Sequence, residues 1–138
     1  MVDRTIHITK FDMDRLLELI EGVRSTPKYS KVNLDLLEQE LYSGILVDSI
    51  NVPKDVITMN STVSVTDTES GEKMTYTLVF PTAANISENK LSILAPLGMA
   101  LIGYRKGDTI KWPVPSGIKK LKVTEIIYQP EAAGDYSL

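Results

Sequence analysis

The sequence predicts an α+β fold in which a short N-terminal antiparallel helical hairpin precedes a mostly antiparallel β-sheet with one short helix. Apolar residues recur at helical spacing through the first third of the chain, and after about residue 52 they alternate as in β-strands. The 138 residues, 43% of them hydrophobic and 24% charged, are typical of a globular chain that buries a core. We therefore place a hairpin unit at residues 1–52 and a sheet unit at residues 53–138.

The composition excludes several classes of protein. There is no cysteine, which excludes disulfide scaffolds, cysteine-ligated zinc sites and thiol nucleophiles. No apolar run approaches the roughly 20 residues of a membrane span, and residues 1–10 lack the layout of a signal peptide. The formal net charge of −3 argues against a general coat for duplex DNA. We expect a cytoplasmic protein without membrane contact or sequence-specific DNA binding.

The first helix is predicted from Phe11 to Arg24. Thr9 and Asp12 form a weak capping-box signal at its start. One apolar stripe then follows at helical spacing, made of Met13, Leu16, Leu17, Ile20 and Val23. A helix of this length would measure about 21 Å.

The second helix is predicted to begin at Asn33, which is a good N-cap. Pro27 ends the first helix because the residue before a proline avoids helical geometry. Gly44 makes the last turn of the second helix weak. The apolar stripe of this helix is Leu34, Leu37, Leu41 and Ile45.

The tip of the hairpin presents Lys28, Tyr29 and Lys31, and no acid lies between Ser25 and Asn33. Asp35 is the nearest acid, alone in the first turn of the second helix, where it opposes the helix dipole. A two-carboxylate metal site at the tip is therefore not expected.

The sheet unit begins with two alternating segments, residues 56–66 and 73–80, which predict a β-hairpin around Gly71. A short apolar run at 89–95 follows. Pro96 then opens a small apolar helix in the N1 position that helices permit to proline.

The chain closes with two further strands. Residues 109–115 carry two prolines and so predict an edge strand. Residues 118–128 form the longest and most β-branched strand. Residues 129–138 are a polar, acidic tail without a strong pattern.

The sequence offers little for catalysis. His7 is the only histidine, it lies in a short extended segment, and no partner stands at metal-ligating or catalytic spacing from it. No glycine-rich phosphate loop is present. We therefore predict neither an enzyme nor a cofactor. Five aromatic residues suit core or interface packing better than base stacking, because no basic residues interleave with them: Tyr29, Tyr104, Trp112, Tyr128 and Tyr136.

The charge is uneven along the chain. Between Tyr104 and Lys122 six bases face one acid, Asp108. The bases are Arg105, Lys106, Lys111, Lys119, Lys120 and Lys122. Two interpretations stay open, namely a solvated strand face and a basic patch that meets an acidic partner.

The motifs resemble a known family. A helical hairpin followed by Leu91–Gly103, Lys106–Asp108 and Pro113–Gly117 is similar to the bacterial Gre transcript-cleavage factors, whose C-terminal domain has an FKBP-like fold. Within that superfamily, Asp55–Ser61 and Tyr128–Tyr136 resemble the family of regulators of nucleoside diphosphate kinase, Rnk.

The resemblance implies a protein that binds RNA polymerase. In Gre factors the C-terminal domain docks at the rim of the secondary channel, and two acids at the coiled-coil tip help to hold a Mg²⁺ ion for transcript cleavage. This chain departs from that pattern, because its tip loop carries no acid and its helices are short.

The resemblance also implies a docking corner between strand and helix. Gre factors present an acidic or polar residue, a serine and a proline there, where this chain has Leu94, Ala95 and Pro96. If Leu94 belongs to the core, binding shifts to its neighbours. The candidate polymerase-binding residues are Pro96, Leu97, Met99, Arg105, Lys106, Lys119 and Lys120.

Three functions follow from these observations. The first is a non-catalytic regulator that binds at the secondary channel and competes with Gre-type factors. The second is an FKBP-like peptide-binding or prolyl-isomerase module, for which the two phenylalanines and one tryptophan are a poor supply of pocket aromatics. The third is direct control of nucleoside diphosphate kinase, for which an indirect link through transcription is an equally good explanation.

Overall fold

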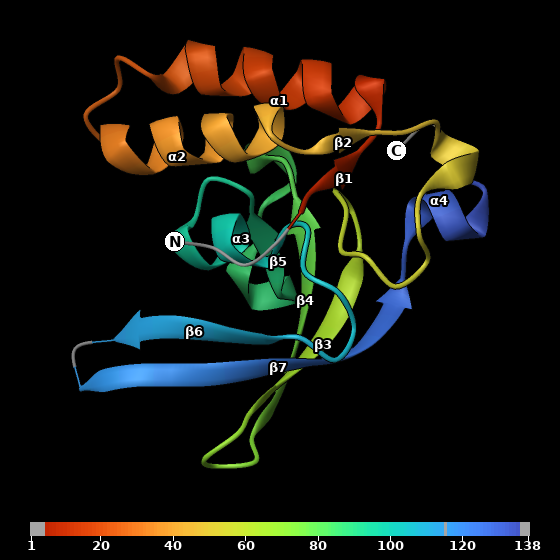
Figure 1. The fold of residues 1–138 in the computed structure, drawn as a ribbon. Helices are drawn as coiled ribbons and strands as arrows, with labels where there is room; N and C mark the ends of the chain where they lie inside the picture. Colours follow the sequence, from red (N-terminus) through yellow and green to blue (C-terminus); the bar gives the residue numbers. More distant parts are fainter. Residues whose placement is uncertain (1–4, 115, 136–138) are drawn as a thin grey trace.

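A computed structural model describes residues 5–114 and 116–135 (Figure 1). Two helices, α1 (Lys10–Val23) and α2 (Lys31–Tyr42), form the predicted hairpin. The predicted cap of α1 is confirmed, since the Thr9 side chain accepts a hydrogen bond from the Asp12 N–H at 3.1 Å.

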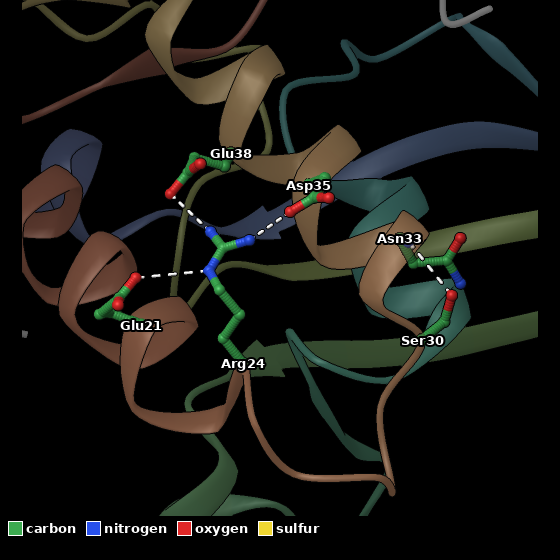
Figure 2. Close-up of polar contacts among 6 residues, drawn as sticks. All are labelled: Glu21, Arg24, Ser30, Asn33, Asp35 and Glu38. Carbon is green, nitrogen blue, oxygen red and sulfur yellow. Dashed lines mark hydrogen bonds and ion pairs between the residues drawn. The ribbon is translucent and has the colours of Figure 1, made fainter.

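Both ends of the second helix differ from the prediction. Ser30, and not Asn33, is the N-cap of α2, because the Ser30 hydroxyl accepts the Asn33 N–H at 3.2 Å (Figure 2). The helix ends at Tyr42, so Ile45 lies outside it. Gly44, just beyond this end, lets the chain approach Ile6 closely, since a Cβ there would overlap the carbonyl oxygen of Ile6.

A small parallel sheet closes the base of the hairpin. Strand β1 (His7–Ile8) pairs with β2 (Ile45–Leu46), and the Ile45 N–H donates to the Ile6 carbonyl at 2.8 Å. A 3-10 turn, η1 (Ser49–Asn51), then leads to the second part of the chain.

The main sheet has five strands in the order β5-β4-β3-β7-β6. Neighbouring strands are antiparallel except for β4 and β5, which are parallel. The strands are β3 (Thr62–Asp67), β4 (Lys73–Val79), β5 (Lys90–Ser92), β6 (Thr109–Val114) and β7 (Gly117–Tyr128). The connections contain η2 (Pro81–Ala83), η3 (Ile86–Glu88) and the helix α3 (Pro96–Leu101). This is the predicted α+β class, with β6 at an edge of the sheet.

Two segments differ from the predicted elements. Residues 56–61 were expected in a strand, but β3 begins only at Thr62, and the preceding residues form a buried loop that turns through Asn60 at a positive φ of 65°. The acidic tail, for which the sequence shows no strong pattern, starts with a short helix, α4 (Pro130–Ala133). Tyr136, one of the predicted packing aromatics, lies outside the described residues.

One continuous hydrophobic core joins the hairpin to the sheet. Leu16, Ile20, Leu34, Leu37 and Leu41 from the two helices pack in the same cluster as inner-face residues of the sheet and residues around α3. The latter include Ile57, Met59, Val63, Val65, Leu78, Ile93, Leu94, Leu101, Ile102, Ile110, Leu121 and Val123. Figure 1 shows the hairpin lying along the body of the molecule, with α2 over α3 and β5. The boundary between residues 1–52 and 53–138 stays a prediction.

In the part of the chain that the structure describes, no helix has the length and apolarity needed to cross a membrane.

Candidate functional site

The corner between β5 and α3 is built by hydrogen bonds from Ser92. Its hydroxyl accepts the Leu94 N–H and its carbonyl accepts the Ala95 N–H, both at 3.0 Å. Pro96 then occupies the first position of α3. Gly98 allows α3 to lie against this turn, because a Cβ there would overlap the Ser92 carbonyl oxygen. These hydrogen bonds and the close packing of α3 therefore fix the position of Pro96.

The three apolar candidates at this corner differ in exposure. Leu94 is buried in the core, which is the case in which binding shifts to its neighbours. Pro96 is exposed, whereas Leu97 and Met99 are half-buried and pack against the core. Pro96 therefore offers the free surface, and the other two side chains support it.

Arg105 and Lys106 lie in a tight turn that precedes β6. The Arg105 guanidinium contacts Asp55 at 2.8 Å, and the Arg105 N–H donates to the Asp108 carboxylate at 2.8 Å. The turn is held against β7 by the Gly107 N–H, which donates to the Val123 carbonyl at 2.7 Å. Lys106 is exposed.

The remaining two basic candidates lie elsewhere. Lys119 stands four residues from Val123 in β7, so it is about 13 Å from the Arg105 turn along the strand. Lys119 faces Asp67 at 3.9 Å, while the neighbouring Lys120 points to the opposite face of the sheet. The structure thus brings Arg105 and Lys106 together but does not bring Lys119 and Lys120 to them.

The tip of the hairpin is stabilised by Arg24 (Figure 2). Its guanidinium bonds to Asp35 and to Glu38, the latter at 2.8 Å, and its Nε contacts Glu21 at 3.3 Å. These hydrogen bonds, the one to Asp35 above all, raise the pKa of Arg24. The sequence suggested that Asp35 stands alone, but in the structure it pairs with Arg24. It lies in the second turn of α2 and joins α2 to the end of α1.

The predicted tip residues have unequal environments. Lys28 and Lys31 are exposed, and the Lys28 ammonium lies 5.5 Å from the centre of the Tyr29 ring. Tyr29 is half-buried and packs against the core. The tip thus presents two cations but keeps its aromatic residue partly inside.

The sequence did not predict the buried carboxylate at the base of the hairpin. Asp12 is 2% exposed and pairs with Arg15, whose guanidinium also stacks on Phe11 and Phe80 at 4.0 and 4.4 Å. Burial raises the pKa of Asp12 to about 6, although the hydrogen bond from Arg15 opposes this shift. Arg15 thus links α1 to the end of β4.

The C-terminal segment is bound to the loop at 53–61. The Gln129 amide donates to the carbonyls of Pro53 and Val56 at 2.8 and 2.6 Å. The Thr58 hydroxyl donates to Glu131 at 2.7 Å. A glutamate three residues into an acidic tail gives no signal of such a contact in the sequence.

No metal centre forms among residues 5–114 and 116–135, where no three His, Asp or Glu side chains are placed to hold an ion. An open cavity of about 490 Å³ lies at the base of the hairpin and is lined by Thr9, Lys10, Phe11, Leu46, Val47, Asp48, Ser49 and Asn51. Phe11 is the only aromatic residue in this lining, whereas a prolyl-isomerase pocket needs a cluster of them.

Comparison with known proteins divides the chain in two. Residues 4–43 match the family described as Rnk N-terminus, and residues 52–128 match the C-terminal family of the transcription elongation factors GreA and GreB. The regulator of nucleoside diphosphate kinase from Escherichia coli strain K12 is 41% identical over 97% of both chains.

Gre factors are also similar. The elongation factor GreA of Syntrophus aciditrophicus is 37% identical over 70% of this chain, which spans only 60% of that protein. The solved structure of a GreA/GreB elongation factor from Nitrosomonas europaea covers 90% of this chain, with 39% identity, a TM-score of 0.77 and 98% of its own length aligned. The sequence and the fold agree, and the chain belongs to the Rnk family of regulators of nucleoside diphosphate kinase, whose C-terminal region is that of the GreA and GreB factors.

Proposed function

We propose that this protein is a non-catalytic transcription regulator that binds RNA polymerase at the rim of its secondary channel and competes there with Gre-type factors. One observation carries the proposal, namely a GreA/GreB C-terminal region joined to a hairpin that folds back onto it. Such a molecule would occupy the docking place of a Gre factor without extending a coiled coil into the channel. This function implies a cytoplasmic location.

The tip of the hairpin supports a role without transcript cleavage. Cleavage of the Gre type needs acids that are free to bind Mg²⁺, but Asp35 and Glu38 are both bound by Arg24. With 14 and 12 residues, α1 and α2 measure about 21 and 18 Å. Arg24 thus holds both acids nearest the tip in ion pairs, and the helices are short.

The proposed contacts with the polymerase are apolar at one point and charged at another. Pro96, supported by Leu97 and Met99, would fit an apolar depression on the polymerase. Arg105 and Lys106 would face acidic side chains of the partner. We place Lys119 and Lys120 at the margin of this surface because the structure separates them from the Arg105 turn.

The link to nucleoside diphosphate kinase is proposed to be indirect, through transcription. Mixing the two purified proteins without polymerase checks this point. We expect no complex, and a stable complex would replace the indirect link by a direct one.

The main test is binding of the purified protein to core RNA polymerase, with a GreA factor as competitor. We expect saturable binding that GreA displaces, and inhibition of GreA-stimulated cleavage by an excess of this protein. Without GreA, we expect no cleavage of backtracked RNA. Absence of binding at micromolar concentration, or unchanged cleavage at excess, would refute the proposal.

A pair of proline variants locates the surface. Pro96→Asp places a charge at the exposed first position of α3, where the helix dipole favours an acid, so folding should be kept. Pro81→Asp is the matched control, because Pro81 likewise opens a helix, η2. We expect the Pro96 variant to bind polymerase at least about tenfold more weakly, as a charge in an apolar contact does, and the control to bind normally.

A further inference from the structure

The outer face of the sheet carries four exposed lysines, and the function proposed above gives a place only to Lys120, at the margin of its surface. They are Lys73 in β4, Lys111 in β6, and Lys120 and Lys122 in β7. Side chains alternate between the faces of a strand, and the buried Val65, Leu121 and Ile110 belong to the inner face. In Figure 1 the helices α1, α2 and α3 lie on one side of β6 and β7. The lysines therefore occupy the side that no helix covers.

The strand register brings these lysines together. Lys111 lies directly opposite Lys120. In the next row Lys73 and Lys122 flank Thr66, because both pair with it from opposite sides. With strands about 4.8 Å apart and about 6.7 Å between alternate residues, the four positions fill an area of roughly 14 by 7 Å.

The cluster is not neutralised within residues 5–114 and 116–135. None of the four lysines forms an ion pair there, whereas Lys90, further along the outer face, pairs with Glu88 at 3.1 Å. Glu69 and Glu72 in the adjoining turn form no ion pair with the cluster, and Glu125 lies opposite Ser64, beyond it. Like charges placed opposite each other destabilise a sheet, and a bound anion would relieve this repulsion.

The surrounding side chains indicate the chemistry of the ligand. Thr66 and Thr109 share this end of the face by register; Thr109 is exposed, and the buried Thr66 hydroxyl has no hydrogen-bond partner in the described part of the chain. Protein interfaces deplete lysine and rely on aromatic or arginine anchors. Lysines among hydroxyl groups are instead typical of contacts with nucleic-acid phosphates.

We propose that this lysine face binds the phosphate backbone of a nucleic-acid strand without sequence specificity. This goes beyond the proposed polymerase contact, since Lys73, Lys111 and Lys122 are not among the docking residues. The net charge of −3 does not oppose it, because Glu69, Glu72 and Glu125, the acids near the cluster, form no ion pair with its lysines in the described part of the chain.

The experiment is fluorescence anisotropy with labelled 20-nucleotide oligouridylate RNA and oligothymidylate DNA, without polymerase. Four phosphate contacts predict a slope of about −2.8 for log affinity against log salt, or roughly a 50-fold loss between 50 and 200 mM. The variant Lys111→Gln/Lys122→Gln should halve the slope to about −1.4, a loss of about sevenfold over the same range. Both oligonucleotides should bind within about threefold of each other, because phosphates are contacted and not bases.

The matched control is Lys10→Gln/Lys54→Gln. It removes the same charge from other parts of the surface and should leave the slope unchanged. No binding at low salt, or an equal loss in both variants, overturns the proposal. If RNA does not bind but Lys111→Gln/Lys122→Gln weakens the complex with polymerase, the face is a protein-docking surface and the nucleic-acid proposal fails. In that case the proposed polymerase binding itself still stands.

Discussion

At the residue scale, Asp12 determines how pH acts on the stability of the hairpin base. Its pKa is raised from 3.8 to about 6 because its carboxyl group is buried. A raised pKa means that the folded state holds the proton more tightly than the unfolded state. The contribution of protonated Asp12 to the free energy of unfolding is therefore complete below about pH 4 and is lost as the pH rises through about 6.

Replacement of Asp12 by asparagine should remove this pH dependence. The free energy of unfolding of the Asp12→Asn variant should exceed that of the natural protein by an amount that grows between pH 4 and 7, up to about 3 kcal/mol. Urea unfolding at four pH values measures this difference. A difference that stays constant with pH would show that Asp12 does not titrate in this range.

We also expect Lys111 and Lys120, which lie opposite each other on the outer face, to repel each other. Lys120→Glu places opposite charges across β6 and β7, because Lys120 faces Lys111. We expect a gain of about 0.5 kcal/mol in the free energy of unfolding. The double variant Lys111→Glu/Lys120→Glu restores a like-charged pair and should lose this gain. If the double variant is equally stabilised, the pair does not interact.

Residue contacts could be predicted from the sequence only where they are local. The Thr9 cap follows from a spacing of three residues, and the structure confirms it. The bond of Arg24 to Asp35 spans eleven positions across the hairpin tip and depends on the course of the loop. The burial of Asp12 depends on distant groups such as Phe80, which holds its partner Arg15.

At the element scale, two glycines in helices should respond to alanine in opposite directions. Gly98→Ala would force α3 away from Ser92, because its Cβ meets the Ser92 carbonyl oxygen, and we expect a loss of about 3 kcal/mol. In α1, a Cβ at Gly22 meets nothing within 4 Å, so Gly22→Ala should gain about 0.5 kcal/mol from helix propensity. Thermal unfolding of both variants tests this, and a tolerated Gly98→Ala would contradict the tight corner.

The pairing of α1 with α2 at the tip should depend on salt. Arg24 contacts three acids, but its side chain is partly exposed, so Arg24→Ala should lower the free energy of unfolding only slightly. Because salt screens such contacts, the cost should shrink between low salt and 1 M. Lys10→Ala, which removes an ion pair with Asp14 at the other end of α1, is the comparison and should cost less. A cost for Arg24→Ala that does not change with salt would indicate lost packing of its side chain instead.

Elements were predictable where periodicity and burial coincide. Both helices and the long strand at 118–128 alternate or repeat cleanly, and the structure contains them. Residues 56–61 contain β-forming residues, yet they form a loop, because Ser61 bonds to Thr58 and closes a turn. The four residues of α4 carry no periodicity, and contacts of Glu131 in the helix and of the adjoining Gln129 with the 53–61 loop hold it in place.

At the scale of the whole molecule, the direction in which the hairpin lies could not be predicted from its sequence. Apolar stripes indicate that α1 and α2 bury one face each, but they do not indicate against which surface. The structure places both stripes in a core shared with Ile93 and Leu101. Arg15 on Phe80 adds a second contact between the two parts. The position of the candidate docking corner at α3, beneath α2, follows from this packing.

The shared core raises the question of whether the sheet unit folds without the hairpin, and Leu37→Asp answers it. Leu37 is fully enclosed, so an aspartate there is incompatible with the packed hairpin. The inner face of the sheet keeps Val63, Val65 and Val123 among its own strands, and we therefore expect residues 53–135 to remain folded. Limited proteolysis should cut the Leu37→Asp variant within α1 and α2 and leave a resistant fragment from about residue 53. The control is Leu36→Asp, which alters an exposed position of α2 and should be as resistant as the natural protein. Complete digestion of the Leu37 variant would show instead that the hairpin and the sheet form one cooperative unit, and that the boundary near residue 52 separates families in sequence but not units of folding.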